Sequence, residues 1–163
     1  MSCLSFPERW GRRLALIGVL LAAGTPACAT PAAIHPFAAD TWRELGQSPL
    51  RPLVVVFTTT DCVHCPQAID SLATAIRRSR SSTRLVVVVM DGAGQEPALR
   101  ADRHYRKASR LYAFDGDAMA LRYTVNPEWR GLTPYVALVP AAGATHFHSG
   151  PPPSAALRAF LGP

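Results

Sequence analysis

Residues 53–66 read LVVVFTTTDCVHCP, and this stretch decides the fold. Its first five residues form a continuous, mostly β-branched apolar run, which is typical of a strand buried on both faces. Apolar residues then recur at helical spacing from Ala68 to Ile76, and arginines follow where a helix C-terminus favours cations. The stretch therefore predicts a buried strand, a turn that carries two cysteines, and a helix.

Other apolar runs place this unit in a sheet. Leu85–Met90 is a second buried strand one helix later, so the two strands form a βαβ unit with parallel pairing and a right-handed crossover. Tyr135–Val139 predicts a third strand, and Ala144–His148 predicts its antiparallel edge partner. We expect an α/β fold with a central mixed sheet of about four strands and helices on both faces.

The remaining segments predict an extended lead-in and four further helices. Residues 30–36 are the lead-in, and apolar spacing predicts helices over Phe37–Leu45 and Ala118–Val125. Glu96–Tyr112 is expected to be a helix with a solvated basic face, the alternative being a patch that binds a partner. Ser154 follows a run of prolines and is expected to cap the last helix.

The N-terminus has the layout of a secretory signal peptide. Three arginines lie among the first thirteen residues, and the apolar run Leu14–Gly24 is too short to span a bilayer comfortably. Ala27-Cys28-Ala29 offers small residues for cleavage after Ala29, which would leave residues 30–163 as one domain. We therefore expect a periplasmic protein; an uncleaved membrane anchor is the alternative.

Cleavage would change the cysteine content and the charge of the chain. Cys3 and Cys28 would be removed, leaving Cys62 and Cys65 in an oxidising compartment, where a close pair can cycle between dithiol and disulfide. The formal charge would fall from +6 to +4, because three Arg and one Glu are lost. This mildly basic balance is no signature of nucleic-acid binding.

The two remaining cysteines lie where the strand gives way to the helix. Their spacing can close a tight disulfide in the first turn of the helix, with only Cys62 projecting toward solvent. Free N–H groups and the positive helix end favour its thiolate, and a lowered pKa increases the nucleophilic form. Cys62 is the expected attacking thiol and Cys65 the resolving thiol. His64 is expected to stabilise the Cys62 thiolate by a hydrogen bond or by its charge.

Three other uses of a Cys-x-x-Cys pair fit less well. A zinc site needs a second pair of ligands, and no further cysteine survives cleavage. A static disulfide across so short a loop constrains the unfolded chain little. A c-type haem site requires His directly after the second cysteine, where this chain has Pro66. The strand–turn–helix context favours redox chemistry over all three.

These features resemble the thioredoxin superfamily, in particular its exported bacterial thiol–disulfide oxidoreductases of the TlpA/ResA type. The resemblance covers Phe37 to Leu161. It rests on the strand at residues 54–57, on the Cys-Val-His-Cys motif, and on Thr133-Pro134-Tyr135 before the third strand. His64, before the second cysteine, is similar to the histidine of DsbA-type members. The order of elements is more similar to the TlpA type.

The resemblance also implies a substrate-binding edge. It implies that Pro134 follows a cis peptide bond beside the cysteines and leaves the Thr133 backbone free to pair with an extended substrate. Trp129, Leu132 and Tyr135 would add apolar contacts, with a core role for Trp129 as the alternative.

The chain departs from the family in two respects. A Trp and a small residue are common before the first cysteine, where this chain has Thr60-Asp61, and an inward carboxylate would oppose the Cys62 thiolate. The acidic residue that assists proton transfer in some TlpA-type members cannot be assigned to Glu44, Asp91 or Glu128.

The sequence thus predicts a thiol–disulfide oxidoreductase that needs no organic cofactor. Its partners would be cysteine pairs of exported proteins and a membrane-linked redox partner, with no nucleic acid, and we expect a monomer. His64 favours an oxidant, whereas the TlpA-like order and Thr133 favour a reductant, which is the direction we expect.

Two other functions stay open. Two thiolates suit Cu(I), and a distant His would complete a copper site as in Sco-type proteins, although their cysteines are spaced one residue wider. A non-catalytic module would hold an extended peptide beside Pro134 and would not need reactive cysteines. His146 and His148 share one face of the predicted edge strand, and no third ligand is fixed by spacing, so an exposed edge is favoured over a metal site.

Overall fold

The computed structural model describes residues 33–162. The predicted signal peptide, with Cys3, Cys28 and the cleavage site after Ala29, lies outside the described residues. Among residues 33–162, no helix combines the length and the hydropathy that a membrane crossing requires.

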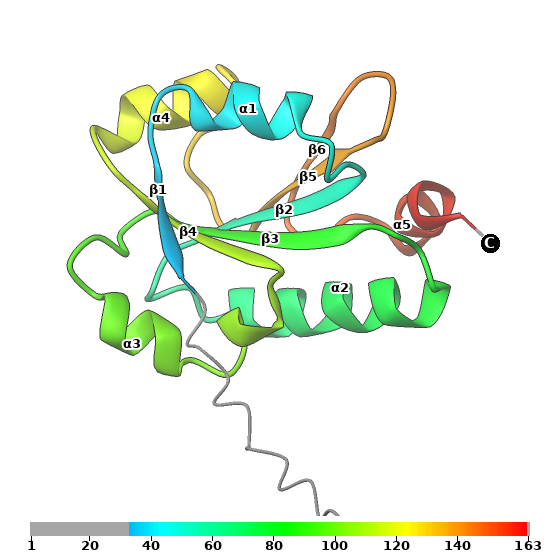
Figure 1. Ribbon diagram of the computed structural model, residues 1–163, viewed down its shortest axis with the longest axis horizontal. Coiled ribbons are helices and arrows are strands. Elements are labelled where there is room, and N and C mark those ends of the chain that lie inside the picture. Colours follow the sequence, from blue (N-terminus) through cyan, green and yellow to red (C-terminus); the bar gives the residue numbers. More distant parts are fainter. Residues whose placement is uncertain (1–32, 163) are drawn as a thin grey trace, which may run out of the picture.

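A six-stranded mixed sheet forms the centre of the described part, in the order β1-β4-β3-β2-β5-β6 (Figure 1). Strands β1 to β4 pair in parallel, and β5 pairs antiparallel with β2 and with β6. The predicted α/β class, a central mixed sheet with helices on both faces, is confirmed, with six strands where the sequence predicted about four. The strands are β1 (Ile34–Phe37), β2 (Leu53–Thr58), β3 (Arg84–Val89), β4 (Arg110–Phe114), β5 (Tyr135–Val139) and β6 (His146–Ser149).

Helices cover both faces of the sheet. Helices α1 and α4 lie on one face, and α2, α3 and α5 lie on the other (Figure 1). The helices are α1 (Thr41–Gln47), α2 (Cys65–Ser79), α3 (Glu96–Ala101), the short 3-10 helix η1 (Tyr105–Lys107), α4 (Ala118–Val125) and α5 (Ser154–Leu161).

The first additional strand comes from the N-terminal lead-in. Phe37, which was predicted to open a helix, instead ends β1 and is fully buried, and α1 begins only at Thr41. Strand β1 is an edge strand, so Pro36 is tolerated there although it has no N–H to donate.

The second additional strand replaces part of a predicted helix. The expected helix over Glu96–Tyr112 is wrong, because the Asp102 side chain accepts the backbone N–H groups of His104 (2.6 Å) and Tyr105 (3.2 Å) and starts η1 after α3 has ended. Strand β4 follows, and its side chains alternate between the two faces of the sheet. The predicted cap at Ser154 is also wrong: Pro153 is the N-cap of α5, and its ring sets the extended backbone there without a side-chain cap.

Two cores lie on the two faces of the sheet, and β2 contributes to both. Val55 and Phe57 belong to one core, whereas Val54 and Val56 belong to the other, so the run is buried on both faces as predicted. We call the first the aromatic core; it lies under α1 and α4, and its rings are Phe37, Phe57, Tyr112, Phe114, Trp129 and Tyr135. We call the second the aliphatic core; it lies under α2, α3 and α5 and includes Val54, Val56, Ile69, Leu72, Ala73, Val87, Val136 and Leu138.

Candidate active site

A disulfide joins Cys62 to Cys65 at the N-terminal end of α2, with the Cα atoms 5.5 Å apart. Cys65 is the first residue of the helix and is only 1% exposed, whereas Cys62 lies in the preceding turn and is half-buried. A reagent from solvent therefore reaches Cys62 before Cys65.

The start of α2 presents a positive electrostatic end to this disulfide. Helix α2 has 15 residues, Pro66 lies in its first turn, and no acidic side chain does. His64 is the N-cap residue, and its side chain makes no capping hydrogen bond. The N–H groups of the first turn therefore keep their partial positive charge on the side where Cys62 lies, which favours an anionic sulfur.

The side chains around Cys62 are turned to solvent. Val63 is 87% exposed, and Asp61 and His64 are exposed as well. The Asp61 carboxylate therefore does not point into the protein. The exposed Val63 places an apolar side chain directly beside the accessible cysteine.

The Thr133–Pro134 segment lies beside the loop that carries the cysteines. Antiparallel pairing of β2 with β5 sets Phe57 opposite Tyr135, so the residues beyond the end of β2 run alongside those before β5. The hydroxyl oxygens of Thr59 and Thr133 are 3.5 Å apart, at the limit of a hydrogen bond. The peptide bond between Thr133 and Pro134 is cis.

Two of the three predicted apolar contacts lie inside the protein. Trp129 and Tyr135 are 7% and 4% exposed, and their rings stack with centroids 4.5 Å apart in the aromatic core. The Trp129 indole N–H donates to the Leu132 carbonyl at 3.0 Å, which fixes the loop before Pro134. Leu132 itself is 68% exposed. Trp129 is therefore a core residue, and of the three only Leu132 is exposed to solvent.

Asp91 is a site residue that the sequence interpretation left without a role. It follows β3, and its carboxylate accepts hydrogen bonds from the backbone N–H and the hydroxyl of Thr60, two residues before Cys62. The available signal was an acidic residue directly after a parallel strand, since the carboxyl ends of parallel strands meet at one edge of the sheet.

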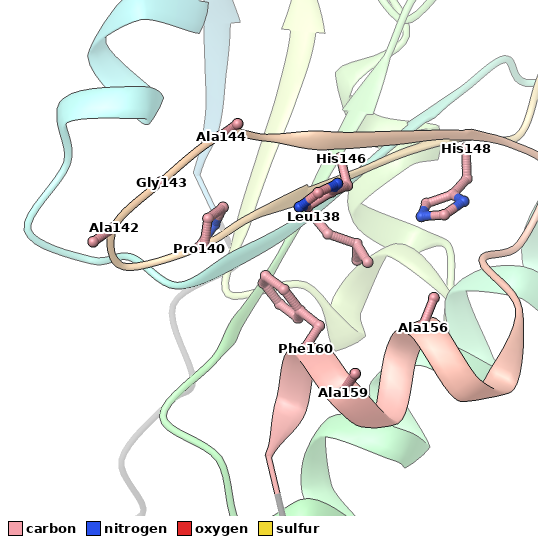
Figure 2. Close-up of a pocket in the computed structure, with 10 residues that line it drawn as sticks. All are labelled: Leu138, Pro140, Ala142, Gly143, Ala144, His146, His148, Ala156, Ala159 and Phe160. Carbon is pink, nitrogen blue, oxygen red and sulfur yellow. The ribbon is translucent and has the colours of Figure 1, made fainter.

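The His146–His148 pair lies away from this loop, on edge strand β6. Both rings turn toward α5, and they line a cavity of about 470 Å³ whose other walls are mainly small apolar side chains (Figure 2). Burial lowers the pKa of His148, and the nearby His146 lowers it further. Within residues 33–162, no three His, Cys, Asp or Glu side chains gather as a metal site would require.

A second polar cluster links the segment after α3 to α2, the helix that begins at Cys65 and that we call the cysteine helix. Asp70 of α2 binds the His104 ring nitrogen Nδ1 at 2.8 Å and the Lys107 ammonium group. Burial tends to raise the pKa of Asp70, but the hydrogen bonds from Lys107 and His104 outweigh it and hold that pKa below its usual value. This cluster joins η1 to α2 in the second turn after Cys65.

Comparisons with known proteins add one structural likeness. No protein-family model matches the sequence, and no curated protein matches it. Among solved structures, the chain is similar to a secreted disulfide oxidoreductase of Mycobacterium tuberculosis that is homologous to E. coli DsbE. The sequences are 19% identical, the alignment covers 62% of this chain and 70% of that one, and the TM-score is 0.44.

Proposed function

We propose that this chain is an exported thiol–disulfide oxidoreductase whose redox pair is Cys62 and Cys65. One observation carries the proposal: the two cysteines form a disulfide at the positive end of a helix, with the first reachable from solvent and the second buried. A nucleophilic cysteine needs exposure and a stabilised thiolate, and a resolving cysteine needs only to reach the first sulfur.

In the proposed reducing direction, the reaction proceeds through two exchange steps. In the dithiol form, the Cys62 thiolate attacks one sulfur of a substrate disulfide; a Cys62–substrate disulfide forms, and the other substrate sulfur leaves as a thiolate. The Cys65 thiol then loses its proton and attacks Cys62 Sγ, which closes the Cys62–Cys65 bond and releases the second substrate thiolate. Two electrons pass to the substrate, and its thiolates take up the two protons.

The surroundings of Cys62 support a protein substrate. Val63 and Leu132 are exposed apolar side chains, one beside the cysteine and one directly before Thr133. We propose that an extended substrate segment pairs with the backbone at Thr133 and places apolar side chains against these two. His64 is proposed to stabilise the Cys62 thiolate. The substrates would be exported proteins with cysteine pairs, and a membrane-linked partner would return the electrons.

Insulin reduction by the full-length chain tests the proposal. The assay uses a background in which Cys3 and Cys28 are changed to Ser, so that only the proposed pair can exchange. The background protein should accelerate dithiothreitol-driven precipitation of insulin, and Cys62→Ser should abolish the acceleration. Cys65→Ser should instead trap a mixed disulfide with the substrate, visible as a covalent adduct by mass spectrometry.

Two outcomes would replace this proposal with another function. If the dithiol protein does not reduce insulin but retains one Cu(I) per chain through both cysteines, a copper-handling role takes its place. If Cys62→Ser still performs the cellular role of the protein, a peptide-binding module without redox chemistry takes its place.

A further inference from the structure

The loop before Cys62 is tied to a carboxylate on the next strand. The Thr60 N–H points to both oxygens of Asp91, at 2.9 Å from Oδ1 and 3.1 Å from Oδ2, and the Thr60 hydroxyl donates to Oδ2 at 2.6 Å. Both carboxylate oxygens thus bind one residue, two positions before the accessible cysteine. Two backbone hydrogen bonds within the loop are longer: Cys62 N–H to the Thr59 carbonyl and Cys65 N–H to the Cys62 carbonyl are both 3.3 Å.

The segment that follows β3 holds the carboxylate in place. The Met90 N–H donates to the Thr58 carbonyl at 2.9 Å, and the Gln95 side chain donates to the Asp91 carbonyl at 2.8 Å. Gly92 is buried, and a Cβ there would lie 2.8 Å from a Leu99 methyl carbon and 3.1 Å from two Val89 side-chain carbons, so a larger residue would require these side chains to shift. Asp91 is therefore anchored on both sides.

No cation neutralises this carboxylate within residues 33–162. The ion pairs there join Asp40 to Arg43 and Asp70 to His104 and Lys107, and none includes Asp91. Its partners at Thr60 are a neutral amide and a neutral hydroxyl, so the full negative charge stays near the cysteine loop. Asp91 is exposed, so water reduces the effect of this charge but does not remove it.

We infer that Asp91 is a positioning residue that fixes the loop before Cys62 and that its charge biases the pair toward donating electrons; this rests on the proposed function. In the dithiol form a thiolate develops on Cys62, and in the disulfide form it does not. A fixed negative charge beside the loop disfavours the thiolate and so favours the disulfide. A pair that prefers the disulfide is the better reductant.

The test compares Asp91→Asn with a matched charge removal, Asp117→Asn, in the full-length background that lacks Cys3 and Cys28. Asp117 also accepts a backbone N–H, from Ala120 at 2.8 Å, but it follows β4, one strand farther from β2 than Asp91. The readouts are the acid dissociation constant of the Cys62 thiol, from the pH dependence of its alkylation, and the equilibrium constant for reduction by glutathione at pH 8.

We expect Asp91→Asn to raise both constants about threefold, as for one partly screened charge near the site, and Asp117→Asn to change neither. Thr60→Val keeps the charge and removes only the hydroxyl bond, so both constants should stay within about twofold of the background values. Equal constants for Asp91→Asn and the background protein would overturn the inference.

The proposed function and this inference fail in different ways. A background protein that does not exchange with glutathione at all removes the proposed function. A background protein that exchanges, with constants that Asp91→Asn leaves unchanged, removes only the role of Asp91. A merely structural role would lower the stability of the variant without moving the Cys62 dissociation constant, so circular dichroism melts of all the variants complete the measurement.

Discussion

The aromatic core and the aliphatic core differ in the size of their side chains, and each supports a different half of the candidate site. In the aromatic core, Trp129 and Tyr135 hold the loop before Pro134. In the aliphatic core, small and branched side chains let α2 pack closely on the sheet, so that Cys65 at its first turn is 1% exposed. The burial of Cys65 thus depends on small side chains, and the position of the loop before Pro134 depends on large rings.

The largest expected effect comes from removing the ring at the centre of the aromatic core. Phe57 is fully buried and lies within 6.4 Å, between ring centroids, of Phe37, Trp42, Trp129 and Tyr135. Phe57→Ala should lower the free energy of unfolding by about 3–5 kcal/mol, because it removes apolar contact and leaves a cavity. Val56→Ala, its neighbour in the aliphatic core, should lower it by about 2 kcal/mol. Guanidinium unfolding of the oxidised proteins measures both.

Equal losses for the two variants would contradict the comparison, since they would show that the cores tolerate cavities alike. An unchanged dependence of the unfolding free energy on denaturant concentration would show that only stability has changed.

The next effect comes from adding volume where the aliphatic core is narrow. Ala73 of α2 is 5% exposed and packs against the sheet. Ala73→Leu should cost about 1–3 kcal/mol, because the helix must move or the side chain must adopt a poor rotamer. The matched variant Ser71→Leu adds the same side chain on the exposed side of the same helix, and it should change the unfolding free energy by less than about 0.5 kcal/mol. Comparable losses would mean that α2 does not pack tightly there.

The sequence predicted the parts of the fold that local pattern determines. The strand at residues 53–58, the cysteine turn and helix α2 follow from a β-branched run and helical spacing. It failed for β1 and β4, which depend on pairing between residues far apart: Ile34 lies opposite Leu111 in the register of the two strands. Four- and five-residue strands with polar neighbours carry too few alternating positions to be distinguished from helix or loop by periodicity alone.

The candidate site was likewise predicted from the sequence only where local pattern determines it. The cysteine pair is visible in the sequence because the residue types and their spacing carry the chemistry. Trp129 could not be assigned to core or surface, since only packing against Tyr135 decides it. Asp91 could not be assigned either, because its contact with Thr60 crosses 31 residues of sequence.

A smaller effect tests the polar edge of the aromatic core. The Asn126 side-chain amide donates to the Tyr135 hydroxyl at 2.8 Å. Tyr135→Phe keeps the stacked ring and leaves the Asn126 donor without this partner, so it should cost about 1 kcal/mol. Burial raises the pKa of Tyr135 against the opposing effect of the Asn126 bond, so the neutral phenol is favoured in the folded state.

That pKa gives the Tyr135→Phe variant a second signature. The pKa of Tyr135 is higher in the folded state than the unfolded value near 10. This difference stabilises the folded state below pH 10, and the stabilisation is lost as the pH rises through the folded pKa. Urea unfolding between pH 8 and pH 11 should therefore show a steeper loss in the parent protein than in the variant. Parallel curves would mean that the folded state does not favour the neutral hydroxyl of Tyr135 over the ionised one.

The smallest effect lies at the far edge of the aliphatic core, where His148 stands opposite Val136. Burial, and secondarily His146, lowers the pKa of His148 below 6.5, so the unfolded chain binds a proton more readily than the folded one. Stability is then present above pH 6.5 and falls as the pH decreases toward the folded pKa. Unfolding between pH 7.5 and pH 5 should show a shallower decline for His148→Gln than for the parent, and an intermediate one for His146→Gln, which removes only the second cause. If all three declined alike, His148 would be as well solvated in the folded chain as in the unfolded one. The aliphatic core would then end before β6 and would consist only of side chains from the inner strands and the helices that cover them.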